Sequence, residues 1–316
     1  MTREGEPGPR FAHRADNKRV AYEETGAPDG LPVFLMHGTP GSRRGPKPRG
    51  IVLYRLGIRL IAYDRPGYGD SDRFEGRDVA DAARDVEAIA DQLELDRFAV
   101  AGRSGGGPHA LACAADERLR SRVTRVAVLV SLAPSDATGL DWFDGMNPDN
   151  QRGFGADRPD TDAVVEEIRQ RATRAAEDPR FLLRDLMAQM GPPDRRAIND
   201  AALRGIIFDT YQEALRAGPY GWIDDVLALR RNWKFDLGAI DTTATPVRLW
   251  HGAEDTFAPA SHGRWLARQI PGAEIEVQPD AAHFDAMQQL PRILRWLTGT
   301  DAPVGTDVLI GARPGQ

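Results

Sequence analysis

Residues 98–107 read Phe-Ala-Val-Ala-Gly-Arg-Ser-Gly-Gly-Gly, a short apolar run followed at once by glycines around Ser104. The apolar run is typical of a buried strand, and the alanine- and leucine-rich residues 108–115 favour a helix directly after it. Between them, residues 102–106 match the G-x-S-x-G pattern, in which a serine stands on a strained turn and the glycines make room for closely packed backbone. The same residues could form an ordinary turn between a strand and a helix, so the rest of the sequence has to decide.

The alternation of strand and helix continues on both sides of this turn. Further apolar runs predict strands at residues 20–25, 32–36, 59–63, 123–130, 246–250 and 274–277. Amphipathic stretches predict helices at residues 78–95, 260–270 and 284–297. A strand–helix–strand order implies parallel pairing with right-handed crossovers. The sequence therefore predicts an α/β fold in which a mostly parallel central sheet is flanked by helices.

One long stretch interrupts this alternation. Residues 134–245 are too many for a loop in a compact domain. Their first part is rich in turn residues, and the later part carries helical patterns broken by glycine and proline. We expect a mainly helical cap at residues 134–245, inserted into a core domain formed by residues 1–133 and 246–316. The tail after Thr298 shows little periodicity and is expected to be poorly ordered.

Composition and charge narrow the classes of partner. A formal net charge of -6, with both signs interspersed, provides no basic surface for nucleic acid. The first residues lack the apolar stretch of a secretory signal, and the longest apolar run, Val126 to Ala133, is far shorter than the ~20 residues that cross a bilayer. We therefore expect a cytoplasmic protein without nucleic-acid or membrane partners. The only cysteine, Cys113, excludes an internal disulfide and is expected to pack in the core.

A serine nucleophile needs a general base, which is most often histidine. The chain has six histidines: His13, His37, His109, His251, His262 and His283. His283 follows the predicted strand 274–277, so it lies in a loop at the carboxyl end of a parallel strand, where functional groups gather. His251 ends the preceding strand and is interpreted as structural, because a carboxylate follows on the next loop. His283 is therefore the predicted base.

The acid that orients this base is predicted at Asp255, although Glu254 is adjacent and the inserted stretch also contains many aspartates. Asp255 lies 28 residues before His283, one strand and one helix earlier. Both loops therefore leave the sheet at the same edge. The carboxylate would hold the imidazole tautomer and stabilise the imidazolium.

An oxyanion hole needs two backbone N–H groups. One is expected at Gly105, directly after the serine and at the start of the following helix. The other is expected in the loop Met36-His-Gly-Thr-Pro-Gly41 at the end of an early strand, and Thr39 is the residue chosen. Viewed alone, this loop also fits an ordinary Gly/Pro turn.

A nucleotide-binding interpretation of the glycines fits less well. Gly102, Gly105 and Gly107 do not keep the G-x-G-x-x-G spacing, and Ser121-Arg122 stand near the position where an acidic residue is expected. No Gly-Lys-Ser/Thr follows, which excludes a P-loop, and no histidine pair has metalloprotease spacing. We expect neither a cofactor nor a metal.

Taken together, five motifs resemble those of the α/β-hydrolase family, in the family's order. They are His37-Gly-Thr-Pro-Gly-Ser42, Asp64-Arg-Pro-Gly-Tyr-Gly-Asp-Ser71, Gly102-Arg-Ser-Gly-Gly106, Gly252-Ala-Glu-Asp255 and His283-Phe284. The resemblance spans about residues 20–297 and implies the α/β-hydrolase fold. The inserted stretch stands where this family usually carries a cap domain.

The sequence departs from the family pattern in two places. Ala281-Ala282 precede His283, where the family often has Gly-Gly or Ala-Gly, and Thr39-Pro40 stand where similar proline iminopeptidases carry paired glycines. The second departure weighs against an aminopeptidase. Ser104 weighs against haloalkane dehalogenases and epoxide hydrolases, which use an aspartate there.

The expected reaction is acyl transfer from a small-molecule carboxylic ester, lactone or thioester to water. Substrate contacts are expected from Arg103, which could meet a carboxylate or instead anchor the turn by a salt bridge, and from the aromatic residues Trp142, Tyr211 and Trp222. Three alternatives stay open: lyase or cyclase chemistry, hydrolysis of a C–C bond, and a catalytically silent ligand-binding module. The oligomeric state is also open, a homodimer included.

Overall fold

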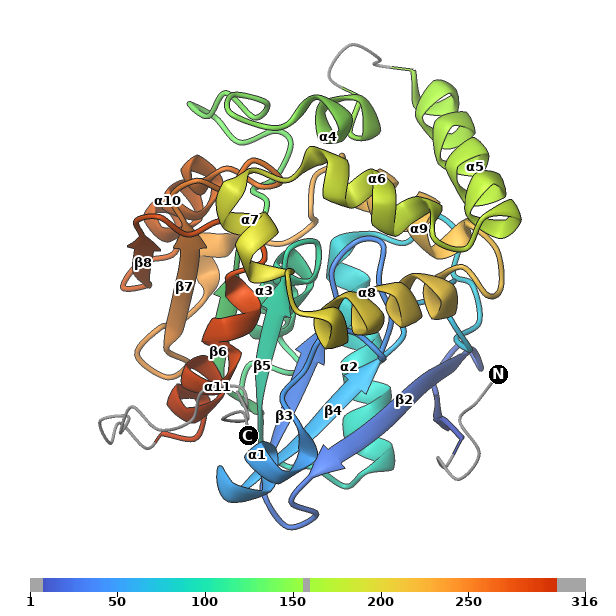
Figure 1. Cartoon of the computed structure of the whole chain (residues 1–316). Coiled ribbons are helices and arrows are strands. Elements are labelled where there is room, and N and C mark those ends of the chain that lie inside the picture. The colour runs from blue at the N-terminus through green and yellow to red at the C-terminus, as the bar shows by residue number, and fades with distance from the viewer. Residues whose placement is uncertain (1–7, 156–159, 300–316) are drawn as a thin grey trace, which may run out of the picture.

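The computed structural model describes residues 8–155 and 160–299, and its centre is an eight-stranded sheet (Figure 1). The strands are β1 (Arg10–His13), β2 (Arg19–Gly26), β3 (Leu31–Met36), β4 (Ile58–Tyr63), β5 (Phe98–Arg103), β6 (Val123–Leu129), β7 (Val247–Gly252) and β8 (Glu274–Gln278). Their order across the sheet is β1-β2-β4-β3-β5-β6-β7-β8. β2 pairs antiparallel with β1 and with β4, and all other neighbours pair in parallel. The predicted mostly parallel sheet is confirmed.

One strand was not expected from the sequence. β1 forms the edge of the sheet and contains His13, which sequence patterns place in an irregular start of the chain. The strand is only four residues long, so its apolar alternation is too brief to stand out.

Helices cover both faces of the sheet. The helices of this part are α1 (Gly50–Arg55), the 3-10 turn η1 (Val79–Asp81), α2 (Ala82–Gln92), α3 (Gly106–Ala115), α10 (Ala260–Gln269) and α11 (Ala286–Leu297). Side chains of α2, α3 and α10 share one apolar cluster, and side chains of α1 and α11 share another. Successive side chains of β5 point to opposite faces of the sheet and so contribute to both clusters. Phe98 and Val100 belong to the first cluster, and Ala99 and Ala101 belong to the second.

Every regular element described between β6 and β7 is helical. These elements are α4 (Pro148–Gly153), α5 (Thr161–Glu177), α6 (Phe181–Gln189), α7 (Pro192–Ala197), α8 (Ala201–Ala214), α9 (Tyr220–Leu229) and the 3-10 turn η2 (Leu237–Ala239). Figure 1 shows α4 to α7 beyond the end of the sheet toward which β5 points. Two further apolar clusters hold this helical segment together.

The parallel part of the sheet determines where functional groups can meet. β3, β5, β7 and β8 run in the same direction, so the loops that follow them leave one edge. Among the described helices, none has both the length and the apolarity needed to cross a membrane. The tail expected to be poorly ordered lies, from residue 300 on, outside the described residues.

Candidate active site

Ser104 stands on the turn between β5 and α3 in a left-handed backbone conformation, with φ at 54°. This region is unfavourable for residues other than glycine and is retained where the surroundings enforce it. The Ser104 N–H donates to Leu129 O at 2.9 Å, and the Gly107 N–H donates to Ser104 O at 2.9 Å. A Cβ at Gly102 would lie 2.2 Å from Gly106 O, so a side chain there would collide with the turn. The structure thus has the local geometry that the G-x-S-x-G pattern predicts.

His283 and Asp255 lie in contact on the loops after β8 and β7. His283 Nδ1 is 2.9 Å from Asp255 Oδ2, and both side chains are buried. The other carboxylate oxygen, Oδ1, accepts from the backbone N–H groups of Phe257 at 2.8 Å and Ala258 at 2.9 Å. These bonds fix the carboxylate, which in turn fixes the imidazole ring and leaves Nε2 as its second functional atom.

A second histidine approaches the same carboxylate. His251 Nε2 lies 2.6 Å from Ala258 O and 3.4 Å from Asp255 Oδ2. Burial alone would raise the pKa of Asp255, but His283 and His251 outweigh it and hold the pKa below its ordinary value. Asp255 therefore stays ionised. His251 reaches the backbone of the Asp255 loop, which agrees with the structural role assigned to it from the sequence.

The loop after β3 brings Thr39 beside Gly105. A Cβ at Gly105 would lie 2.2 Å from Thr39 Oγ1 and 3.3 Å from Thr39 N, so only glycine fits there. The backbone N–H groups of Thr39 and Gly105 donate to none of the described residues. A Cβ at Gly38 would lie 3.4 Å from Ser104 Cβ, which places this loop against the serine. The two N–H groups are thus close to each other and to Ser104.

Two buried histidines hold these backbone segments. His37 Nδ1 lies 2.8 Å from Gly38 O, and its Nε2 accepts from the Arg65 N–H at 3.2 Å. His109 Nδ1 lies 2.7 Å from Gly105 O. Burial lowers the pKa of His109 to about 3 and, with nearby Arg65, holds the pKa of His37 well below its usual range, so both rings are neutral.

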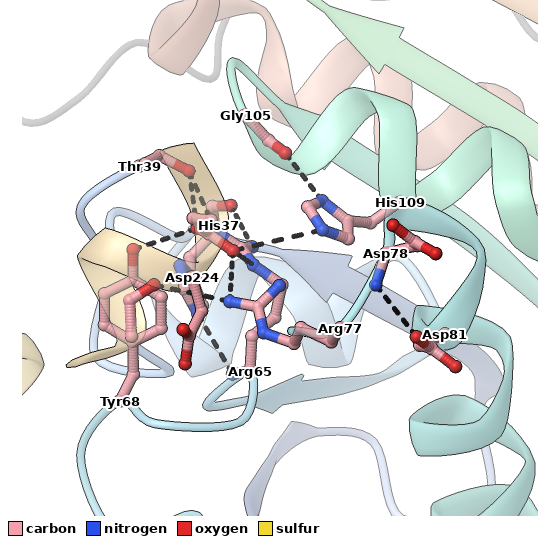
Figure 2. A network of polar contacts seen from close by, with 12 residues as sticks. His37, Thr39, Arg65, Tyr68, Arg77, Asp78, Asp81, Gly105, His109 and Asp224 are labelled. Carbon is pink, nitrogen blue, oxygen red and sulfur yellow. Dashed lines mark hydrogen bonds and ion pairs between the residues drawn. The ribbon is translucent and has the colours of Figure 1, made fainter. Parts of the chain in front are cut away.

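Asp225 of α9 forms a buried polar network that was missed from the sequence. Its carboxylate accepts from Thr39 Oγ1 at 2.6 Å, from Tyr68 Oη at 2.9 Å, from Arg65 Nε at 3.0 Å and from Arg77 Nη2. Figure 2 labels Thr39, Arg65, Tyr68 and Arg77, whose side chains belong to this network of polar contacts. Burial would raise the pKa of Asp225, but the two guanidinium groups outweigh it and hold the pKa well below its ordinary value.

A sequence signal for this network did exist. Apart from Asp224 and Asp225, the buried residues of α9 are glycine or apolar, among them Trp222, Ile223 and Val226. An acidic residue inside such a helix has to be paired when it is buried. The Asp64–Ser71 motif contains two of the partners, Arg65 and Tyr68, for which the sequence alone predicted no role.

A cavity of about 150 Å³ joins the predicted residues. Ser104, Gly105, Thr39, His283 and Arg103 all line it. Its apolar wall includes Ile168, Leu182, Leu186, Ile207, Trp222 and Phe257.

The predicted aromatic contacts divide into two groups. Tyr211 and Trp222 line the cavity, and burial raises the pKa of Tyr211 to about 12, so its hydroxyl keeps its proton. Trp142 is not among the residues that line this cavity, so its contact with a substrate stays a prediction. Its indole N–H donates to Ala133 O at 2.8 Å, and its ring packs edge-on against Phe154 and His262. Packing accounts for its position.

One group of acidic side chains is compact enough to suggest a cation site. Asp64, Asp70 and Glu213 each offer an oxygen within 4.8 Å of the others. The Arg43 guanidinium lies among them, with Nη2 2.9 Å from Asp70 and Nη1 2.8 Å from Glu213, and it also bonds Asp64. The cation these acids bind is therefore Arg43.

Comparisons with known proteins agree with this geometry. The family model described as alpha/beta hydrolase fold matches residues 32–289. An AB hydrolase superfamily protein of Bacillus subtilis is 27% identical over 256 residues, which cover 80% of this chain and 85% of the relative. The 2-hydroxymuconate semialdehyde hydrolase of Pseudomonas putida is 27% identical over 280 residues, covering 84% and 85%.

A bromoperoxidase structure from Bacillus anthracis superposes with a TM-score of 0.70 at 22% identity, covering 93% of this chain and all of that one. In several other curated relatives, among them non-heme chloroperoxidases and proline iminopeptidases, the chain matches only 42 to 56% of the relative's length. The family match covers most of the chain, and the sheet order and the turn at Ser104 agree with it. The chain is a member of the α/β-hydrolase fold family.

Proposed function

We propose that the protein is a serine hydrolase that cleaves a carboxylic ester, lactone or thioester of a small molecule through an acyl-enzyme. One observation carries the proposal: Ser104, on its strained turn, shares a cavity with His283, whose Nδ1 contacts the buried Asp255. A serine hydroxyl is a weak nucleophile unless a base accepts its proton. The arrangement supplies such a base together with the group that orients it.

In the proposed mechanism, Ser104 Oγ attacks the carbonyl carbon while its proton passes to His283 Nε2. The carbonyl oxygen takes up the negative charge and is held by the N–H groups of Thr39 and Gly105. His283 then protonates the leaving alcohol or thiol, and the acyl group stays on Ser104. A water molecule that loses its proton to His283 releases the carboxylic acid and restores the serine.

Asp255 takes part without accepting the proton. Its pKa is held below the ordinary value, so it remains an anion while His283 becomes an imidazolium. The helical segment at residues 134–245 acts in this proposal as a cap that closes the cavity with apolar side chains. Substrate choice would lie largely with α5, α6, α8 and α9, which supply that wall.

The test is the intact mass of the protein after treatment with a fluorophosphonate, beside a p-nitrophenyl ester assay. The unmodified chain should gain the mass of one phosphonyl group, and Ser104→Ala should gain none. Ser135→Ala is the matched control, because Ser135 is an exposed serine bonded to Arg230 O and absent from the cavity lining. An adduct that persists in Ser104→Ala, or a folded protein that forms no adduct, contradicts the proposal.

Cleavage of a C–C bond is the second candidate. It is favoured by the similarity to the 2-hydroxymuconate semialdehyde hydrolase, which covers 85% of that relative. The coloured substrate of that relative distinguishes the two. Loss of its absorbance at a rate far above that of the p-nitrophenyl esters would favour the C–C hydrolase, and the opposite order favours the ester hydrolase.

A further inference from the structure

Arg103 stands directly before Ser104, and its side chain lines the same cavity. A Cβ placed on Gly38 would lie 3.4 Å from Ser104 Cβ and 3.7 Å from Arg103 Nη2. The serine and the guanidinium therefore both lie beside Gly38, in the loop of residues 37–41 that carries the proposed oxyanion-hole residue Thr39 and is called the oxyanion loop below. A small molecule attacked by Ser104 lies within reach of this cation.

The guanidinium has no acidic partner of its own. Arg103 forms no ion pair with any residue in the described ranges, and its Nη1 is buried without a hydrogen-bond partner. Two other arginines line the cavity, and both are paired: Arg43 with four carboxylates and Arg171 with Asp185. The salt bridge that the sequence left open as an anchor for the turn is therefore not formed with a described residue.

The two carboxylates whose charges act on Arg103 already have other hydrogen-bond partners. Asp255 holds His283, and Asp194 Oδ1 accepts from the Phe284 N–H at 2.7 Å. Two further neighbours carry no full negative charge: Tyr211, whose hydroxyl keeps its proton, and the Phe284 ring, which forms a cation–π contact with its centroid 5.6 Å from Arg103 Cζ. Guanidinium stays charged at any physiological pH, and a half-buried charge with an enclosed, unpartnered Nη1 calls for an anion. The open side of Arg103 is the cavity.

We propose that Arg103 binds a carboxylate of the substrate, so that the preferred substrate is an anionic acyl compound whose carboxylate lies a few bonds from the carbonyl attacked by Ser104. A half-ester of a short dicarboxylic acid has this form. The planar fork of guanidinium matches a carboxylate bidentately, which fixes orientation as well as charge. The assignment of a substrate class rests on the proposed function.

The test compares monoethyl succinate with ethyl 4-methylpentanoate, in which an isopropyl group replaces the carboxylate at the same chain length. The wild-type protein should favour the anionic ester in kcat/KM. Arg103→Gln should lower the ratio of anionic to neutral kcat/KM about 10- to 100-fold, the range of a charge-assisted hydrogen bond. Arg103→Lys keeps the charge without the fork and should lie between the two.

Arg171→Gln is the matched control, because Arg171 lines the same cavity but is paired with Asp185. It should leave the ratio within about threefold of wild type, well inside the effect expected of a charged bond. A wild-type protein that prefers the neutral ester overturns the proposal. So does a folded Arg103→Gln variant that lowers both esters equally, since that is what a structural role would do.

Failure of the proposed function is recognised separately. If no fluorophosphonate adduct forms and neither ester is cleaved, succinate binding is measured by calorimetry on wild type and Arg103→Gln. Binding that is lost in the variant supports the carboxylate site on its own. No binding of succinate to wild type overturns it.

Discussion

Asp255 and Asp225 are both fully buried and both have pKa values below the ordinary one, yet their partners differ in kind. Asp255 faces His283 and His251, whereas Asp225 bonds Arg65, Arg77 and two hydroxyl groups and has its histidine neighbour, the neutral His109, only at 4.0 Å. Histidine exchanges a proton near neutral pH, and arginine does not. The first carboxylate is thus suited to a reaction that moves a proton, and the second to holding backbone and side chains in place.

The largest effect is expected on the rate, when the residues that act together with Asp255 are removed. Ser104→Ala and His283→Ala should each lower kcat for an accepted ester by ~10⁴- to 10⁶-fold, and the double variant by little more. The reason is that the two residues act as one unit. Steady-state and single-turnover rates check this, and additive losses in the double variant would show that they act separately.

Asp255→Asn comes next. The amide cannot stabilise an imidazolium and favours the wrong tautomer, so kcat should fall by ~10⁴-fold. Because histidine can stay neutral, the substitution leaves no permanently charged group buried without a partner. We therefore expect a large loss of rate but only a small change in melting temperature. A variant that is mainly unfolded at 25 °C would erase the distinction between the two aspartates.

Asp225→Asn should show the reverse balance. Removing the anion leaves two buried guanidinium groups without their charge partner, which lowers the free energy of unfolding by about 3 to 5 kcal/mol. In the folded fraction, kcat/KM should fall by about 10-fold or more, because Thr39 loses the acceptor of its hydroxyl and the oxyanion loop is less well held. Urea unfolding and assays at 10 °C measure the two effects.

Thr39→Val separates those two effects. It removes the hydroxyl that donates to Asp225 and accepts from Arg65 Nη2 at 3.2 Å, and it leaves the ion pairs of Arg65 and Arg77 with Asp225 intact. A loss of kcat/KM with little loss of stability would assign the positioning role to the two hydrogen bonds of this hydroxyl. Unchanged activity in Thr39→Val would restrict Asp225 to stability.

The smallest effect is expected at Asp194, a buried aspartate for which no ion pair with a described histidine or arginine is found. Burial raises the pKa of Asp194 to about 6, because it outweighs the nearby His283 and the Phe284 N–H, which favour the anion. In the unfolded chain an aspartate titrates near 3.9. Between about pH 4 and pH 6 the folded protein keeps a proton that the unfolded chain has lost, so stability falls as the pH rises through this window.

Asp194→Asn removes that titration and keeps an oxygen that can accept the Phe284 N–H. The variant should be about 1 to 3 kcal/mol more stable than wild type at pH 7.5 and no more stable at pH 3.5, since one pKa unit corresponds to about 1.4 kcal/mol. Urea unfolding at the two pH values checks it. A constant difference across pH would mean that Asp194 does not titrate in this window.

What could be predicted from the sequence depended on how local its cause is. The turn at Ser104 follows from glycines within a few residues, and the contact of Asp255 with His283 follows from two loops at one edge of a parallel sheet. Asp225 contacts Thr39 across 186 residues and Arg65 across 160, and no periodicity reports such pairs. The surroundings of Trp142 were hard to predict for a related reason, because an aromatic residue that lines a cavity and one that packs beneath it can have the same local sequence.

The bond between Asp225 and Thr39 also decides which parts of the protein can move during turnover. α9 is part of the inserted helical segment by chain order, yet its aspartate is fastened to Arg65, Arg77 and the oxyanion loop. Swinging α9 outward to admit substrate would strip both arginines of their partner and release the loop at the same moment. These bonds join α9 to the sheet, so we expect any passage for a substrate to open elsewhere in the helical segment between β6 and β7.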